Sequence, residues 1–490
     1  MSGFVSLVGA GPGDPELITV KGRRALERAD VVVHDHLANE ALLQHAPRAL
    51  HIYAGKKKAD HALKQEEICA LLIEHARAGR RVVRLKGGDP YLFGRGGEEA
   101  EALSQAGIPF DVIPGVTAPL GIAAYCGVPL THREHTSVVT FLTGHDPDLI
   151  DWSKTAGAET LVIYMGLTTI GEISRRLIEA GRAAGTPAIA VRWATRPEQQ
   201  TVRATLGELP AAVAEAHLKP PATIIVGDVA ALGGELNWYE RLPLFGKRIV
   251  VTRAEDQAAE SIDALRALGA DAIELPSISI QPPESWMALD TAIERLDQYD
   301  WLIFTSVNGV RFFTERLDRS PRDLRRLRAR IAVIGDRTRA AVEALHLKAD
   351  VMPGEFVAES LLESLAPHEM AGQRVLIPRA AVARDILPES LRKRGAVVDV
   401  VEAYRTAIPA DATERTAAVF SRHVDWITFT SSSTVKNLLA IAGRDKIERA
   451  KLASIGPVTS QTMRMHGLRV DVEAHPHTMA DLIAAIQHLS

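Results

Sequence analysis

Short apolar runs rich in β-branched residues alternate along this chain with longer helical patterns rich in Ala, Leu and Arg. The clearest runs are SLVG at 6–9, VVVHD at 31–35, RVVRLKG at 81–87, LVIYMG at 161–166 and TIIVG at 223–227. Runs of this length and composition are typical of strands. Their alternation with helical segments predicts an α/β fold.

The rhythm breaks once, in an aromatic and proline-containing stretch at 238–245, and a fresh strand pattern begins at 248–252. A chain of 490 residues is too long for one compact domain, given about 150 residues per domain. We therefore place a domain boundary near 241–246, which predicts domains over 1–241 and 246–490.

The second half contains an internal repeat. The segment GKRIVVTRAEDQAAESIDALRALGADAIEL from Gly246 parallels GQRVLIPRAAVARDILPESLRKRGAVVDVV from Gly372, and DWLIFTS from Asp300 parallels DWITFTS from Asp425. A third pair, RIAVIG and KLASIG, begins at Arg330 and at 451. Two similar α/β lobes are expected.

Each copy of the repeat has an apolar strand that ends in hydroxyl residues, Thr305-Ser306 in one and 430–433 in the other, before a helical pattern. Hydroxyls and free N–H groups at such a turn form an anion site at the carboxyl edge of a parallel sheet. The plainer interpretation is helix N-capping. Two symmetric copies favour a ligand site between the lobes.

Three glycine-rich loops lie in the first half, at 9–14, 86–99 and 113–118. The first has Asp14 where a dinucleotide fingerprint would have glycine, and no loop ends in the Lys-Ser/Thr pair of a nucleotide P-loop. Dense glycine permits close backbone approach to a flat ligand, although it also simply makes turns. The second loop is too elaborate for a plain connection, and we expect it to bind a ligand.

Composition excludes several classes of protein. The net charge of −4 provides no basic field for nucleic acid or an anionic membrane. Two cysteines are too few for a disulfide framework or a cysteine-based zinc site, and no bound metal is expected. No apolar run approaches the ~18 residues of a membrane span, and the N-terminus does not look like a secretory signal. A cytoplasmic protein is expected.

The loops together resemble the uroporphyrinogen-III C-methyltransferases of the tetrapyrrole methylase family. The matching segments are VGAGPGDPELIT, VVRLKGGDPYLFGRGGEE, IPGVTAPLGIAAYCGVPLTHR and YMGL, in order and spacing, and they span nearly all of 1–240. The resemblance implies a two-lobed class III methyltransferase fold that binds S-adenosylmethionine in a cleft between its lobes. It also implies a homodimer.

By position, the resemblance implies cofactor contacts at Pro12, Gly87, Gly88, Asp89, Leu92, Thr117, Ala118, Met165 and Ala194. It implies Asp35 as proton acceptor and Lys56 as proton donor. A helix cap is the plainer interpretation of Asp35, and a solvated charge run that of Lys56. The chain departs from the family pattern around Ala194, where Asn-Gly-Thr is usual, and around Lys56, where GKRAG is usual.

Residues 246–490 resemble uroporphyrinogen-III synthase through VVTR, the FTS turns, EAYRT at 402–406 and IGPVT at 455–459. Such synthases have two similar α/β lobes joined by a two-stranded linker. The resemblance implies a catalytic role for Tyr404, which is otherwise an aromatic plug in the linker. It implies that substrate carboxylates are held by Thr305, Ser306, Asn308, Ser431, Ser432, Ser433 and Thr459. Arg253 and Arg379 end equivalent strands of the repeat and are candidate carboxylate ligands.

The combined interpretation is a bifunctional enzyme. The second half would cyclise hydroxymethylbilane to uroporphyrinogen III, and the first would methylate it twice to precorrin-2, towards siroheme or cobalamin. Three alternatives stay open: a methylase for a later corrin intermediate, a second half that only binds a tetrapyrrole, and a full siroheme synthase. The last would need a dinucleotide-binding module, and the sequence has no such fingerprint.

Overall fold

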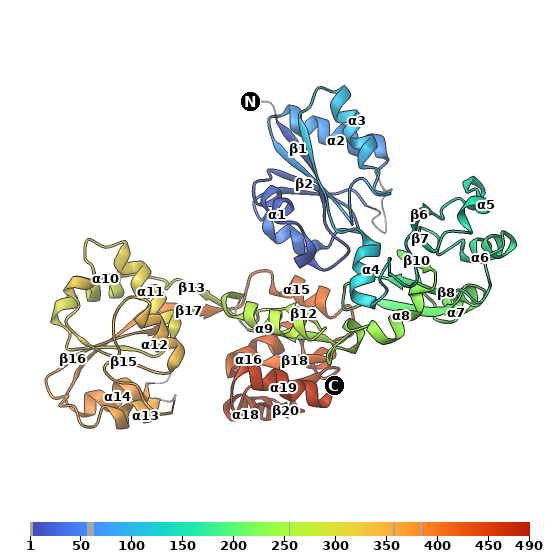
Figure 1. Ribbon diagram of the computed structural model, residues 1–490. Helices are drawn as coiled ribbons and strands as arrows, with labels where there is room; N and C mark the ends of the chain where they lie inside the picture. The colour runs from blue at the N-terminus through green and yellow to red at the C-terminus, as the bar shows by residue number, and fades with distance from the viewer. Residues whose placement is uncertain (1–2, 56–62, 254, 356–357, 383–384) are drawn as a thin grey trace. The chain divides into compact units, whose positions relative to one another are not determined.

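The computed structural model describes residues 3–55, 63–253, 255–355, 358–382 and 385–490. These residues form two compact units (Figure 1). The first unit is Met1–Lys247 with Leu265–Asp271 and Ser490, and the second is Arg248–Ala264 with Ala272–Leu489. The described residues contain no helix that is both long and apolar enough to cross a membrane.

The first unit begins with a lobe built on a fully parallel five-stranded sheet of order β3-β2-β4-β1-β5. Its strands are β1 (Phe4–Gly9), β2 (Val31–His34), β3 (Leu50–Tyr53), β4 (Arg81–Lys86) and β5 (Phe110–Ile113). Its helices are α1 (Val20–Glu27), α2 (Gln65–Arg77) and α3 (Gly96–Gln105). Two apolar clusters pack on this sheet, one with Val31 and Val33 of β2 and the other with Val32. Burial on both faces explains the uninterrupted apolar runs in the sequence.

A second lobe of the same unit holds a mixed sheet of order β6-β7-β10-β8-β9. Its strands are β6 (Val139–Thr143), β7 (Thr160–Tyr164), β8 (Pro187–Arg192), β9 (Gln200–Thr205) and β10 (Ala222–Val226), of which only β6 and β7 pair in parallel. Its helices are α4 (Ala118–Cys126), α5 (Trp152–Thr155), α6 (Ile170–Glu179), α7 (Leu209–Glu215) and α8 (Val229–Leu236).

The aromatic stretch expected to mark the domain boundary packs onto the first unit. Tyr239 is buried, and its ring centroid lies 4.8 Å from that of Tyr125 and 5.2 Å from that of Phe245. The Tyr239 hydroxyl donates to the carbonyl of Thr195 at 3.4 Å. The first unit runs through Lys247, so the residues around the proposed boundary belong to the methylase-like half. The boundary itself stays a prediction.

The second unit contains two five-stranded sheets, of order β12-β11-β18-β19-β20 and β13-β17-β16-β14-β15. The strands are β11 (Arg248–Val251), β12 (Asp271–Glu274), β13 (Ser279–Gln281), β14 (Trp301–Phe304), β15 (Arg330–Val333), β16 (Arg374–Ala380), β17 (Val397–Ala407), β18 (Trp426–Phe429), β19 (Lys451–Ser454) and β20 (Val472–Glu473). The helices are α9 (Glu255–Ala267), α10 (Met287–Glu294), α11 (Val307–Asp318), α12 (Asp336–Glu343), α13 (Ala358–Ser364), α14 (Ile386–Lys393), α15 (Ala412–Val419), α16 (Ser432–Ala442), α17 (Arg444–Ile447), α18 (Pro457–Met465) and α19 (Met479–Leu489). The antiparallel pair β13 and β17 provides the expected two-stranded linker.

The internal repeat is confirmed, and the structure adds how its copies combine. Strands β11, β12, β14 and β15 recur as β16, β17, β18 and β19. Each sheet nevertheless takes two of these strands from each copy, since β11 pairs with β18 and β14 pairs with β16. Even the bridge between Ala332 and Val351 has its counterpart, in the pairing of Ala453 with Val472. The two lobes are therefore interleaved in sequence.

Candidate active sites

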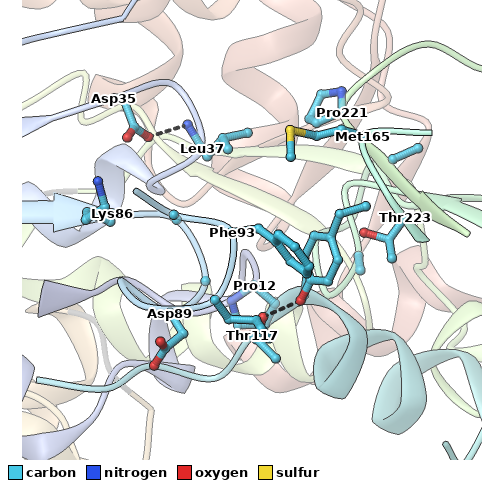
Figure 2. Close-up of a pocket in the computed structure, with 18 of the residues that line it drawn as sticks. Pro12, Asp35, Leu37, Lys86, Asp89, Phe93, Thr117, Met165, Pro221 and Thr223 are labelled. Carbon is cyan, nitrogen blue, oxygen red and sulfur yellow. Dashed lines mark hydrogen bonds between the residues drawn. The ribbon is translucent and has the colours of Figure 1, made fainter. Parts of the chain in front are cut away.

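A cavity of about 530 Å³ lies in the first unit (Figure 2). It is lined by Asp35 and by all nine positions at which the resemblance implied cofactor contacts: Pro12, Gly87, Gly88, Asp89, Leu92, Thr117, Ala118, Met165 and Ala194. These residues come from separate segments of the chain, and the fold brings them to one place. Their roles in binding stay predictions. Lys56 lies outside the described residues.

The three glycine-rich loops approach one another so closely that any side chain larger than that of glycine would collide with the neighbouring backbone. A Cβ atom on Gly9 would lie 2.5 Å from the amide nitrogen of Gly115, and one on Gly115 would lie 2.3 Å from the carbonyl oxygen of Gly88. Gly88 has a φ of 69° and donates to the carbonyl of Gly11 at 2.8 Å. Asp89 then ties the loops together, because its carboxylate accepts from the Gly115 amide at 3.0 Å. The glycines thus serve backbone packing as well as any ligand.

Strained backbone gathers around the same cavity. Four lining residues other than glycine have a positive φ: Phe93 at 55°, Arg95 at 58°, Met165 at 52° and Trp193 at 51°. Each such residue costs on the order of 1 kcal/mol or more, and strain of this kind concentrates at functional sites. Met165 is half exposed, and its side chain lines the cavity (Figure 2). We interpret the strain as fixing these side chains for a ligand.

One wall of the cavity carries charged side chains from neighbouring strands. Asp35 follows β2, and Arg84 and Lys86 lie on β4, which pairs with β2. Arg84 Nη2 donates to Asp35 Oδ2 at 2.9 Å, and the Leu37 amide donates to Asp35 Oδ1 at 3.0 Å. The second bond forms a local turn after β2, but this turn caps no helix, because the next helical turn begins at Glu40 and is capped by Asn39. The interpretation of Asp35 as a helix cap is therefore wrong, and its role as proton acceptor stays a prediction.

Arg84 and Lys86 are almost entirely buried, and both reach the carboxylate of Glu99 on α3. Burial lowers the pKa of Lys86, and the neighbouring Arg84 lowers it further, while Glu99 opposes both effects. None of these three residues is among the candidate site residues expected from the sequence. Arg84 and Lys86 could have been found as charges inside an otherwise apolar strand run, whereas nothing next to Glu99 in the segment 86–99 indicates that its carboxylate is buried.

Aromatic residues form another wall of the cavity. Tyr164 and Thr117 share a hydroxyl–hydroxyl hydrogen bond of 2.6 Å (Figure 2). The Phe93 ring lies 4.8 Å from the Tyr164 ring. Burial raises the pKa of Tyr164 to about 12, so the hydroxyl stays protonated at neutral pH. Thr117, an expected cofactor contact, is thereby held in place by Tyr164.

In the second unit the structure brings Tyr404 and Ser306 together. The Tyr404 hydroxyl lies 2.9 Å from the Ser306 hydroxyl, and the Tyr404 ring stacks on Phe312 with a centroid distance of 5.9 Å. Burial raises the pKa of Tyr404, although the hydrogen bond to Ser306 opposes this. Tyr404 is thus a packed linker residue, and its hydroxyl reaches an expected substrate ligand.

The hydroxyl turns cap helices, as the plainer interpretation predicted. Ser306 Oγ accepts from the Gly309 amide at 3.1 Å, and Ser431 Oγ accepts from the Thr434 amide at 3.3 Å. Ser432 bonds the Thr462 hydroxyl at 2.7 Å. The other expected ligands lie at the same strand-to-helix turns or helix starts, with Asn308 and Thr459 buried and Thr305 and Ser433 at least partly exposed.

The two arginines at equivalent strand ends of the repeat, Arg253 and Arg379, were expected to bind substrate carboxylates. The side chain of Arg379, the next-to-last residue of β16, is 12% exposed and pairs with Asp385. Arg253 lies just after β11 and is partly buried. A carboxylate ligand at Arg379 would therefore have to share or displace Asp385. Substrate contacts at both arginines stay predictions.

A turn in the first unit brings together His132, Glu134 and His135, with potential metal-ligating atoms within 4.8 Å of one another. The His132 Nδ1 accepts a hydrogen bond of 3.2 Å from the Glu134 amide. A neutral imidazole that accepts at Nδ1 carries its proton on Nε2 and so has no free nitrogen for a metal. We assign no metal to this turn.

Comparisons with known proteins cover both halves. Residues 5–210 match the family model described as tetrapyrrole (corrin/porphyrin) methylases, and residues 259–484 match that described as uroporphyrinogen-III synthase HemD. A porphyrin biosynthesis protein HemD from Ruminiclostridium josui is 36% identical over 98% of this chain and 97% of its own length.

Two further relatives match the first half. A uroporphyrinogen-III C-methyltransferase from Bacillus subtilis is 46% identical over 49% of this chain and 95% of its own length. A siroheme synthase from Chromobacterium violaceum is 49% identical over 49% of this chain. The chain spans about half the length of that siroheme synthase, 52%.

Proposed function

Because the chain belongs to the family of two-part proteins in which a tetrapyrrole methylase precedes a uroporphyrinogen-III synthase, we propose that it carries out two steps of tetrapyrrole biosynthesis. The second half closes hydroxymethylbilane into uroporphyrinogen III. The first half then transfers two methyl groups from S-adenosylmethionine to this product and gives precorrin-2. The order of the halves along the chain is the reverse of the reaction order.

The observation that carries the methylase proposal is the composition of the cavity. Ten expected residues, from loops more than 180 positions apart in the sequence, line one space of about 530 Å³. Small-molecule sites commonly enclose ~300–1,000 Å³ with mostly apolar walls and a few convergent polar groups. Leu92, Ala118 and Met165 provide apolar walls, and glycine backbones permit close approach. These features fit S-adenosylmethionine.

When bound, S-adenosylmethionine supplies an electrophilic sulfonium methyl group. The pyrrole carbon of the substrate is already nucleophilic, so the chain must mainly align the reactants and accept the proton released. Asp35 is the candidate acceptor, since its carboxylate lines the cavity and is held by Arg84 on one oxygen and the Leu37 amide on the other.

The synthase proposal is supported by the pair of Tyr404 and Ser306. Loss of water from hydroxymethylbilane gives a cation-like azafulvene that closes by itself to the symmetric isomer, so the enzyme must control geometry. A weak acid suffices for the loss of water. The raised pKa of Tyr404 keeps its hydroxyl protonated. The hydroxyls of Ser306 and of 431–433 lie at helix starts, where carboxylates are favoured.

The deciding experiment incubates purified full-length protein with hydroxymethylbilane, with and without S-adenosylmethionine, and identifies products by mass and isomer analysis. Uroporphyrinogen III without the methyl donor, and precorrin-2 with it, are the expected products. Formation of only the symmetric isomer, with normal methylation of supplied uroporphyrinogen III, would instead identify the second half as a tetrapyrrole-binding module.

We further propose that the protein works in the cytoplasm as a homodimer formed through its methylase half, and that separate enzymes oxidise precorrin-2 and insert the metal. The chain contains no dinucleotide-binding fingerprint for an oxidation step. Light scattering of the purified protein measures the assembly directly, and a mass of one chain would contradict the dimer.

A further inference from the structure

Glu99 is a buried carboxylate that the proposed mechanism does not use. It lies in the first turn of α3 with no exposed surface and does not line the cavity. Its Oε1 accepts from Gln65 Nε2 at 3.1 Å, from Arg84 Nε at 3.1 Å and from Lys86 Nζ at 2.8 Å. The side chain therefore collects three donors that do line the cavity.

Stability alone does not explain this charge. A buried ion pair recovers its desolvation penalty only when every polar atom is satisfied, and well-packed apolar residues often stabilise a site more. Glu99 falls short of that condition, because its Oε2 is buried without a hydrogen-bond partner among the described residues. A carboxylate held at such a disadvantage is better explained by what it does to Arg84 and Lys86.

Arg84 connects Glu99 to the candidate proton acceptor. Its guanidinium donates through Nε to Glu99 and through Nη2 to Asp35 Oδ2, at 2.9 Å. Its Nη1 donates to the carbonyl oxygens of Leu85, at 3.1 Å, and Val33, at 3.4 Å. Because the guanidinium is a rigid plane, fixing its Nε edge on Glu99 also fixes the Nη2 edge that Asp35 contacts.

The balance of charges in this network also indicates that Glu99 affects Asp35. The network contains two carboxylates, Asp35 and Glu99, and two cations, Arg84 and Lys86. The ammonium group of Lys86 donates a hydrogen bond to Glu99. Without the Glu99 charge, both cations would turn to Asp35, the one remaining carboxylate of the network. A base that is overpaired with cations accepts protons less readily.

We propose that Glu99 is a positioning residue for methyl transfer, acting through Arg84 and Lys86 on Asp35. This inference rests on the proposed methylase function of the first half. It assigns no contact between Glu99 and the substrate or the methyl donor. Its effect should therefore appear in the rate of methyl transfer and depend on the presence of the Asp35 carboxylate.

The test is a double-mutant cycle in the full-length protein, with Glu99→Gln, Asp35→Asn and the pair, assayed with supplied uroporphyrinogen III and S-adenosylmethionine. Glu99→Gln should lower kcat for methylation by about tenfold or more, without exceeding the loss from Asp35→Asn, which acid–base catalysis bounds at about 100- to 10,000-fold. KM for the methyl donor should change less than twofold. In the Asp35→Asn background, Glu99→Gln should cost nothing further.

The matched control is Glu101→Gln, the same change on the exposed side of α3, which should leave methylation unchanged. If Glu99→Gln does not fold, Arg84→Lys is used instead. It keeps the positive charge and removes the planar guanidinium that connects Glu99 to Asp35. Its loss of methylation rate should likewise disappear in the Asp35→Asn background. Multiplicative losses in the cycle, or a normal kcat in folded Glu99→Gln, would overturn the positioning role. An unmodified protein that methylates nothing would instead overturn the proposed function itself.

Discussion

The hydroxyl of Tyr404 lies 2.9 Å from the hydroxyl of Ser306, and the same serine oxygen accepts from the Gly309 amide at the start of α11. One atom thus joins the linker strand β17 to the helix start where a substrate carboxylate is expected. A tyrosine with a raised pKa, held against a helix cap, is placed to donate a proton or a hydrogen bond rather than to act as a base.

The first prediction is that Tyr404→Phe slows ring closure while the protein stays folded. The ring remains stacked on Phe312, so the stability lost should be only that of one hydrogen bond, about 1 kcal/mol. The loss of rate should be partial, since the leaving group is activated by its own pyrrole. Rate and isomer ratio are measured together with hydroxymethylbilane as substrate, because released product closes by itself to the symmetric isomer.

Tyr299→Phe provides the matched control. Tyr299 is buried in the same apolar cluster, and its hydroxyl donates to Asp399 at 2.6 Å. Tyr299→Phe should lose at least as much stability, because its hydrogen bond is to a carboxylate, and it should keep normal ring closure. If Tyr404→Phe also gives a normal rate and isomer ratio, Tyr404 is a linker plug, and the acid must be sought among the hydroxyl turns or the substrate's own carboxyls.

The second prediction concerns Asp35→Asn, which preserves shape and removes the charge. Methylation of supplied uroporphyrinogen III should slow by about 100- to 10,000-fold, the usual contribution of a positioned acid or base. Cyclisation in the other half should be unchanged. Asp228→Asn, at an exposed residue before α8, should leave both activities normal. A normal methylation rate in Asp35→Asn would show that Asp35 serves only to form its turn with Leu37.

Much of the fold and of the cavity could be predicted because the signals are local. A strand buried on both faces needs an uninterrupted apolar run, and loops that approach as closely as Gly9 and Gly115 need glycine. Each of these requirements produces a recognisable pattern within a few residues of the sequence. The α/β class and the repeat followed from such patterns, whereas the individual cavity residues followed from the resemblance to the tetrapyrrole methylases.

Other features have no local signal. Glu99 ends the glycine-rich segment 86–99, which was expected to be a loop, but the structure begins α3 at Gly96, and the burial of Glu99 follows from its contacts with Arg84 and Lys86 on β4. The interleaving of the repeat depends on the pairing of β11 with β18, more than 170 positions away. The packing of Tyr239 on Thr195 likewise reflects long-range contacts, so the aromatic stretch looked like a linker in the sequence.

The third prediction separates the halves. A fragment ending at Phe245 should fold and methylate, because it keeps the ring contacts that Tyr239 makes with Tyr125 and Phe245. A fragment ending at Leu236 should be less stable, since it lacks the buried Tyr239. Thermal unfolding and methylation of the two fragments are compared directly.

The complementary fragment from Gly246 should cyclise hydroxymethylbilane by itself. Some stability of the first fragment is expected to be lost in the cut, because the Leu244 amide donates to Leu268 at 2.9 Å and Leu268 lies beyond it. Insoluble fragments, or loss of either half-reaction after separate purification, would show that the boundary or the independence of the halves is wrong.

The last prediction concerns the pH dependence of stability in the first unit. Burial pushes the pKa of Glu240 up, but hydrogen bonds from Thr201, Gln199 and Asn237 outweigh it and hold the pKa below its usual value. A carboxyl with a lowered folded pKa stabilises the fold above its unfolded pKa, near 4.3, and loses this contribution as pH falls through the folded value.

Glu240→Gln should therefore destabilise the first unit by about 1.5–3 kcal/mol at pH 7, the range for hydrogen bonds to a charged group. The difference from the unmodified protein should shrink as the pH falls below about 4, where the native carboxyl also becomes neutral. Urea unfolding of the fragment ending at Phe245, followed from pH 7 to pH 3, measures this difference. Glu235→Gln, at an exposed position of α8, is the control and should show no such convergence. A destabilisation that stays constant across this range would mean that Glu240 acts through its shape and packing, with no contribution from its charge.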